Sequence, residues 1–94
     1  MTNKTTLSVR IASMRKRYAR ILPVYADLGF RIANRRIVLG LRQEDLAKLA
    51  KLSRGSVANI ESGFQRCNLE VIQRFAKALS VSPNNLVKNL KWRA

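Results

Sequence analysis

The sequence predicts an all-α fold of five helices, preceded by an additional basic N-terminal helix. Three observations lead to this prediction. Glycine and proline are scarce, with four and two residues, which disfavours a turn-rich β fold. Apolar residues recur at steps of three and four, as one face of a helix requires. Residue types that begin or end helices follow each other at short intervals, and no segment alternates as a strand would.

The first expected helix covers residues 7–22. Its apolar residues lie along one helical face, at steps of four and three: Leu7, Ile11, Met14, Tyr18 and Ile21. Arginine and lysine fill the other faces: Arg10, Arg15, Lys16, Arg17 and Arg20. Pro23 is expected to end or kink this helix, and residues 23–29 are expected to form a connector.

A second helix is expected at about residues 30–39 and a third at about 43–50. The apolar positions of the second helix are Phe30, Ile32, Ala33, Ile37 and Val38. Gly40 is a natural C-terminal stop for it. Glu44 and Asp45 lie in the first turn of the third helix, where the helix dipole favours negative charge.

Three further helices are expected, each after a side chain that can cap first-turn amides: about 54–61 after Ser53, about 69–79 after Asn68, and about 83–90 after Ser82. Pro83 suits a first helical turn because its missing N–H has no partner there. Gly63 is expected to end the helix at 54–61.

Charge is the strongest compositional signal. The 94 residues include 19 Lys and Arg against 5 Asp and Glu, a net charge of +14 with a pI of about 11.6. Such a surplus repels itself unless a polyanion neutralises it. Nucleic acid is the first candidate, and an anionic membrane surface is the second.

Several function classes are disfavoured by what the sequence lacks. It has no His, the commonest general base and metal ligand, and five scattered acids form no metal cluster. No apolar run reaches the roughly 18 residues that span a bilayer, and no signal peptide is evident. We therefore expect no enzyme activity, no metal and no cofactor. Cys67 stands alone, as an incidental core residue or a redox switch.

The helices expected at 43–50 and 54–61 are joined by a tight turn, as in a helix-turn-helix. Such helices need a small residue where they cross, and Ala47 stands there. The inner faces would bury Leu46, Ala50, Leu52, Val57 and Ile60. The second helix leaves a polar face at its start: Arg54, Gly55, Ser56 and Asn59. A helix fits the major groove of DNA, where its first residues reach base edges.

This pattern resembles the lambda-repressor and Cro-like helix-turn-helix family over about residues 30–90. The matching positions are Arg36, Gly40, Leu41, Gln43, Leu46, Ala47, Ser53, Val57, Ile60, Glu61, Gly63, Leu69 or Ile72, Ala76, Ala78, Leu79 and Val81. The resemblance implies a five-helix lambda-repressor-like DNA-binding domain at 27–94, with the helix-turn-helix at about 43–62. Residues 1–26 would be a basic amphipathic helix or arm.

The resemblance also implies residue roles. Gln43 would clamp a phosphate, and Arg66 would touch the DNA backbone. Arg36 and Glu61 would form a buried pair between the first family helix and the recognition helix. The residues expected to contact DNA are Arg42, Gln43, Ser53, Arg54, Gly55, Ser56, Asn59 and Arg66.

Two positions depart from the family pattern. Lys51 replaces the usual turn glycine, at a cost on the order of 1 kcal/mol in a left-handed conformation. Arg42 replaces the usual Ser, Thr or Asn cap, losing roughly 1 kcal/mol. Arg42 also adds a cation where a phosphate would lie.

Simpler interpretations stay open at this stage. Arg54 could read guanine or could only contact phosphate or solvent. Asn59 could read adenine or face solvent. Gly55 could let the backbone approach DNA or could merely be a weak helix residue. The basic helix at 7–22 could pack on the core or a second subunit, grip DNA, form a loose arm or lie on a membrane.

The preferred interpretation is a sequence-specific, dimeric repressor or regulator of phage or mobile-element type, in the cytoplasm of a bacterial or phage-host cell. Its partner would be double-stranded DNA with a pseudo-palindromic operator, whose half-sites lie about 34 Å apart. Leu86, Leu90 and Trp92 either form the homodimer seam or only close the domain. The alternative is an antitoxin whose residues 7–22 bind a toxin. No membrane association is expected.

Overall fold

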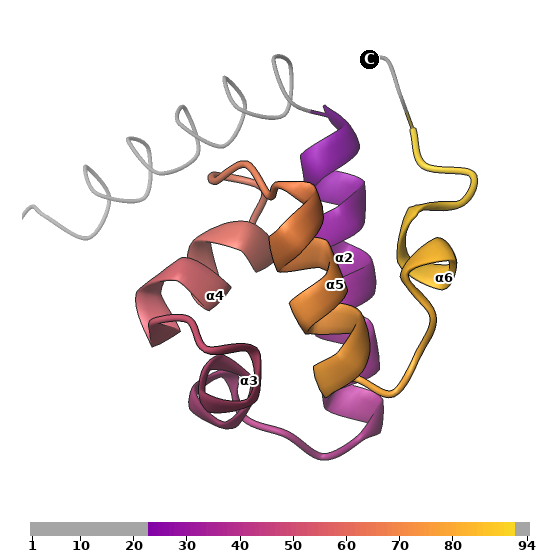
Figure 1. Ribbon diagram of the computed structural model, residues 1–94. Coiled ribbons are helices and arrows are strands. Elements are labelled where there is room, and N and C mark those ends of the chain that lie inside the picture. The colour runs from indigo at the N-terminus through magenta and orange to yellow at the C-terminus, as the bar shows by residue number, and fades with distance from the viewer. Residues whose placement is uncertain (1–22, 92–94) are drawn as a thin grey trace, which may run out of the picture.

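The computed structural model describes residues 23–91, which form five helices and no strand. The helices are α2 (Pro23–Val38), α3 (Gln43–Ala50), α4 (Arg54–Glu61), α5 (Leu69–Ala78) and α6 (Pro83–Val87). In the view of Figure 1, α5 lies in front of α2, with α3 and α4 on one side and α6 on the other. The helix α2 packs against α4 and α6, and α5 packs against α3 and α6. The all-α prediction is confirmed. The helix expected at 7–22 lies outside the described residues.

The connector expected at residues 23–29 is wrong, because these residues form the first turns of α2. Pro23 is the first described residue and lies within α2. Gly29 lies inside α2 and is buried. The sequence pattern predicts that Gly29 interrupts the helix, whereas the structure places it where α2 packs closely against α4.

The other helices begin and end close to their predicted positions. Ser53 accepts a hydrogen bond from the Ser56 amide at 3.0 Å, and Asn68 accepts one from the Val71 amide at 2.9 Å. Ser82 caps α6 in the same way. The helix α6 is shorter than predicted, since it ends at Val87 instead of about residue 90.

Positive-φ residues end α2, α3 and α4. Gly40 ends α2 at φ 73°, and Gly63 follows α4 at φ 81°. Lys51 ends α3 in the left-handed conformation, at φ 59° and ψ 48°. This lysine therefore takes the strained conformation predicted from its position in the motif, where glycine would pay no steric cost.

The core draws on every helix. Its fully buried large side chains include Leu28 and Ile32 of α2, Leu46 of α3, Val57 of α4 and Phe75 of α5. Ala47, expected at the crossing of α3 and α4, is 4% exposed. A small side chain there lets the two helices approach closely, so the turn between them is held by packing on both sides.

Some apolar residues do not enter this core. Several remain on the surface: Phe30, Ile37, Val38, Leu39, Leu49 and Leu69. Leu86 and Leu90 show the reverse, since they are 3% and 6% exposed and pack within their own chain. Of the two interpretations left open for these leucines, the one in which they close the domain is therefore confirmed. Trp92, the third residue considered for a dimer seam, lies outside the described residues.

Candidate nucleic-acid interface

The helix α4 and its C-cap Ser62 present an exposed face without apolar side chains. Val57 and Ile60 are buried, whereas Gly55, Asn59 and Ser62 are exposed at successive steps of four and three. This spacing places the three exposed residues along one line on the helix surface. The exposed Arg54 stands beside this line at the first residue of α4. One side of α4 is therefore buried against the core, and the opposite side is exposed to solvent.

Gly55 faces open space. A Cβ added to it would meet only the Ser53 hydroxyl oxygen, at 3.9 Å, which is ordinary contact. Its φ is not in the left-handed region, so nothing within the protein requires glycine here. The missing side chain instead leaves the backbone of the first turn open to an approaching molecule.

A largely buried ion pair joins the core-facing side of α4 to α2. The Arg36 guanidinium donates to both Glu61 carboxylate oxygens, from Nε at 2.7 Å and from Nη2 at 3.0 Å. The two side chains are 14% and 6% exposed. A third guanidinium nitrogen donates to the Leu41 carbonyl at 2.9 Å. The pair implied by the resemblance is therefore present, and its planar, two-bond geometry fixes the angle between the helices.

Gln43 joins this network. Its amide Nε2 donates to the Glu61 Oε1 at 2.9 Å, although the residue stands at the start of α3. Glu61 thus accepts hydrogen bonds from two other helices at once. The sequence motif suggested only a phosphate role for Gln43, and the hydrogen bond to Glu61 adds a structural role. The phosphate contact stays a prediction.

Arg42 and Asp45 form an exposed pair at the start of α3. The Asp45 carboxylate accepts the Arg42 backbone N–H at 2.9 Å, which restores part of the cap that Arg42 itself cannot supply. It also accepts two bonds from the guanidinium, each at 3.1 Å. These bonds from Arg42 lower the pKa of Asp45. In the free protein the cation at Arg42 is therefore already paired.

The remaining predicted contacts are placed as follows. Ser53 is exposed, and its oxygen caps α4. Ser56 is partly buried, and Arg66 is exposed in the loop between α4 and α5. The basic residues proposed to add DNA backbone contacts lie outside the described residues: Arg10, Arg15, Lys16, Arg17 and Arg20.

Sequence reasoning missed two residues at this surface. Ser62 lies on the exposed line of α4, and its step of seven from Gly55 would have indicated this. Asp45 was noted only for its position in the first turn, although the spacing of three from Arg42 is that of a capping box.

The comparisons with known proteins agree with this geometry. A family model described as a helix-turn-helix domain matches residues 27–88. With the exposed face of α4 and the Arg36–Glu61 pair, this match decides the family. The chain belongs to the lambda-repressor-like helix-turn-helix family. It is accordingly a DNA-binding transcriptional regulator and not an enzyme.

Solved structures of other family members superpose on this helix-turn-helix protein. The restriction-modification controller protein C.AhdI from Aeromonas hydrophila is 35% identical, with a TM-score of 0.65, over 66% of this chain and 94% of the other. The P22 c2 repressor, solved with a synthetic operator, is 34% identical, with a TM-score of 0.61, over 65% and 92%.

More distant matches show the fold alone. The clp gene regulator ClgR from Corynebacterium glutamicum is 22% identical, with a TM-score of 0.65, over 67% of each chain. Among curated proteins no sequence matches this chain. Within residues 23–91, no helix combines the length and apolar character needed to cross a bilayer. In the same range, no group of three or more potential ligands is placed to hold a metal ion.

Proposed function

We propose that this protein is a sequence-specific repressor that inserts α4 into the major groove of double-stranded DNA. The observation that carries the proposal is the exposed line of α4, which begins at Gly55 and includes Asn59, beside the exposed Arg54. The guanidinium of Arg54 could donate to the two acceptors of guanine, and the amide of Asn59 could pair with adenine. Gly55 lets the helix backbone approach the bases.

Residues around α4 would hold the phosphates. Arg42 and Gln43 stand at the start of α3, and Arg66 stands in the loop after α4. Ser53 and Ser56 flank the first turn of α4 and would add hydroxyl donors. Phosphate contacts position the protein, whereas base contacts specify the sequence. With a net charge of +14, binding should weaken steeply as salt rises.

We also propose that the protein binds as a homodimer to a pseudo-palindromic operator in a bacterial or phage-host cytoplasm. One α4 reaches a single half-site, and a two-fold axis would place the second about 34 Å away. The P22 c2 repressor, 34% identical, was solved with a synthetic operator. A regulator of phage or mobile-element type fits that likeness. The dimer surface must lie elsewhere than Leu86 and Leu90, which are buried.

Selection of bound duplexes from a random DNA pool, with the full chain, tests this proposal. We expect one enriched site with two related halves separated by about one helical turn. Asn59→Ala in the same selection should change the preference at one position in each half. A pool that shows no enrichment at moderate salt would overturn sequence-specific binding. A single, unrepeated half-site would overturn the dimer.

A further inference from the structure

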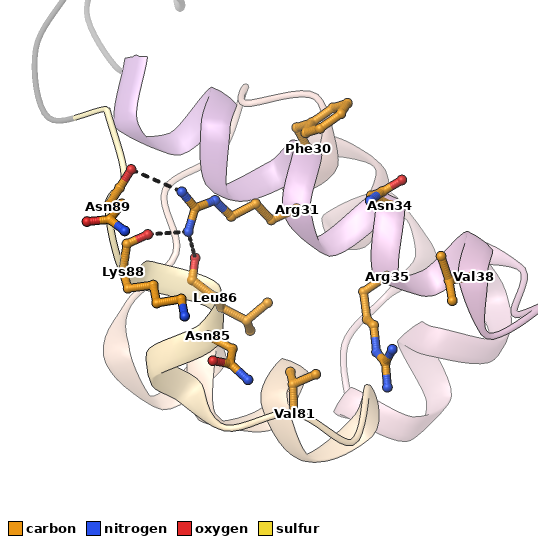
Figure 2. A pocket seen from close by; sticks show the side chains of 10 residues that line it. All are labelled: Phe30, Arg31, Asn34, Arg35, Val38, Val81, Asn85, Leu86, Lys88 and Asn89. Carbon is orange, nitrogen blue, oxygen red and sulfur yellow. Dashed lines mark hydrogen bonds between the residues drawn. The ribbon is translucent and has the colours of Figure 1, made fainter.

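A groove lies between the outer face of α2 and α6, and it faces solvent (Figure 2). Its volume is about 440 Å³. Phe30 and Val38 line its α2 side, and Val81 lines the other. Phe30 and Val38 are each 67% exposed. Apolar side chains gathered in a concave surface commonly mark a site for a partner.

Hydrogen bonds fix the walls of this groove. The Arg31 guanidinium donates to three carbonyls at the end of α6, drawn as dashed lines in Figure 2: those of Leu86, Lys88 and Asn89. Arg35 Nε donates to the Leu79 carbonyl, just after α5, at 3.1 Å. Both arginines belong to α2, so α2 is tied to the carboxyl ends of α5 and α6. The groove is therefore formed before any partner arrives, which lowers the entropic cost of binding.

Cations border the apolar surface. Arg31, Arg35 and Lys88 line the groove, and no acidic residue does. Asp27 lies 3.6 Å from the Arg31 guanidinium and balances its charge, so Arg35 and Lys88 supply the positive charge offered to a partner. Lys88 is exposed, and the terminal nitrogens of Arg35 make no hydrogen bond within residues 23–91.

On α2 the groove carries Asn34 between Phe30 and Val38, so its surface is apolar in part and edged by positive charge. Such a surface complements a helix that carries apolar side chains on one face and carboxylates along its margins.

The charges of this chain argue against its own segments as the occupant. A second copy offers few free carboxylates, because four of the five acids are ion-paired: Asp27, Asp45, Glu61 and Glu70. Residues 1–22 contain cations and no acid. Either occupant would bring positive charge to the positive rim. Duplex DNA has the right charge but offers little apolar surface to Phe30.

We propose that this groove binds an acidic amphipathic helix of another protein. The groove lies on the opposite side of the bundle from α4 (Figure 1), and no residue of α3 or α4 lines it. A partner could therefore bind while α4 is on DNA. Such a surface would let the regulator bring a second protein to its operator.

The test uses a designed, fluorescently labelled helical peptide about as long as α2, with leucines along one face and glutamates on the flanks. Its anisotropy is measured with the full chain, free and bound to duplex DNA. We expect saturable binding in both states. Phe30→Ala should weaken it about tenfold or more, since a buried aromatic side chain contributes 1.5–3 kcal/mol, roughly a factor of ten or above. Lys88→Glu, as a second single variant, should also weaken peptide binding, because it places a negative charge beside the glutamates of the peptide.

Two controls separate this site from general attraction to a basic protein. Leu69→Ala removes another exposed apolar side chain, on α5 and outside this groove, and should leave the affinity unchanged. A peptide of the same composition in scrambled order should bind at least tenfold more weakly. The proposal is overturned if the scrambled peptide binds equally well, if Phe30→Ala has no effect, or if duplex DNA displaces the peptide. None of these outcomes depends on the DNA sequence preference of α4.

Discussion

Gly29 of α2 lies so close to Ile60 of α4 that a Cβ added to Gly29 would stand 2.2 Å from the Ile60 carbonyl oxygen. The Glu61 carbonyl oxygen would be 2.6 Å away. Both obstacles are backbone atoms, so neither can turn aside as a side chain could. The backbone of α2 at Gly29 therefore packs directly against the backbone at the C-terminal end of α4.

We expect Gly29→Ala to destabilise the protein by about 3 kcal/mol, because overpacking against backbone outweighs the roughly 1 kcal/mol that alanine gains in a helix. Urea unfolding followed by circular dichroism measures this. Gly55→Ala is the matched control, since its Cβ would meet nothing closer than 3.9 Å. It should raise stability by about 0.5–1 kcal/mol. Equal stability of the two variants would contradict the close contact.

Local signals in the sequence predicted much of this fold, because caps and stops act on neighbouring residues. Ser53, Asn68 and Gly40 behave as their chemistry predicts. The buried position of Gly29 could not be predicted, since the approach of Ile60 is a tertiary contact between residues far apart in the chain. Periodicity alone treats a glycine in a helix as a weak point.

The apolar residues of α2 show a second limit. Its helical surface carries apolar side chains on more than one side, and periodicity does not say which side meets the core. Ile32 is fully buried, whereas Phe30 and Val38 are exposed. At the candidate site, resemblance predicted the Arg36–Glu61 pair, but the bond from Gln43 to Glu61 depends on where α3 stands relative to α4.

Glu61→Gln should destabilise the protein by about 2–3 kcal/mol, because it leaves the partly buried Arg36 guanidinium without its counter-charge while an amide oxygen can still accept from it. Glu70→Gln is the control. Its partner is Arg74, and the side chains of Arg74 and Glu70 are 37% and 70% exposed, so the loss should stay below about 1 kcal/mol. Chemical denaturation of both variants gives the comparison. Similar losses for the two would show that the Arg36–Glu61 pair contributes no more than a surface pair.

Arg54→Ala should lower affinity for the selected operator by about 1–3 kcal/mol and relax the preference at one base pair. Arg66→Ala should weaken all duplexes alike and reduce the slope of log affinity against log salt by about one. Anisotropy titrations over a series of salt concentrations, on matched and mismatched duplexes, separate these effects. If Arg54→Ala also weakens every duplex equally, Arg54 contacts phosphate and does not read a base.

Cys67 is expected to be inert in the folded protein. It is 4% exposed, and burial raises the pKa of its thiol from an ordinary 9.0 to about 11. The thiolate is the reactive form, so a thiol reagent at pH 8 should modify the native protein far more slowly than the urea-unfolded protein. Between pH 9 and 11 the unfolded state loses this proton first, so the contribution of Cys67 to stability falls as pH rises. Fast modification of the native protein would contradict this prediction and favour the hypothesis that Cys67 is a redox switch.

Lys51→Gly should stabilise the protein by up to about 1 kcal/mol, because glycine adopts the left-handed conformation without the steric cost that lysine bears at φ 59°. Lys48→Gly is the matched control, since it makes the same substitution and removes the same charge within α3. There glycine should cost about 1 kcal/mol in helix propensity. Opposite shifts of the urea midpoint identify backbone strain at Lys51 as the cause. Equal shifts would mean instead that the loss of one positive charge dominates both variants.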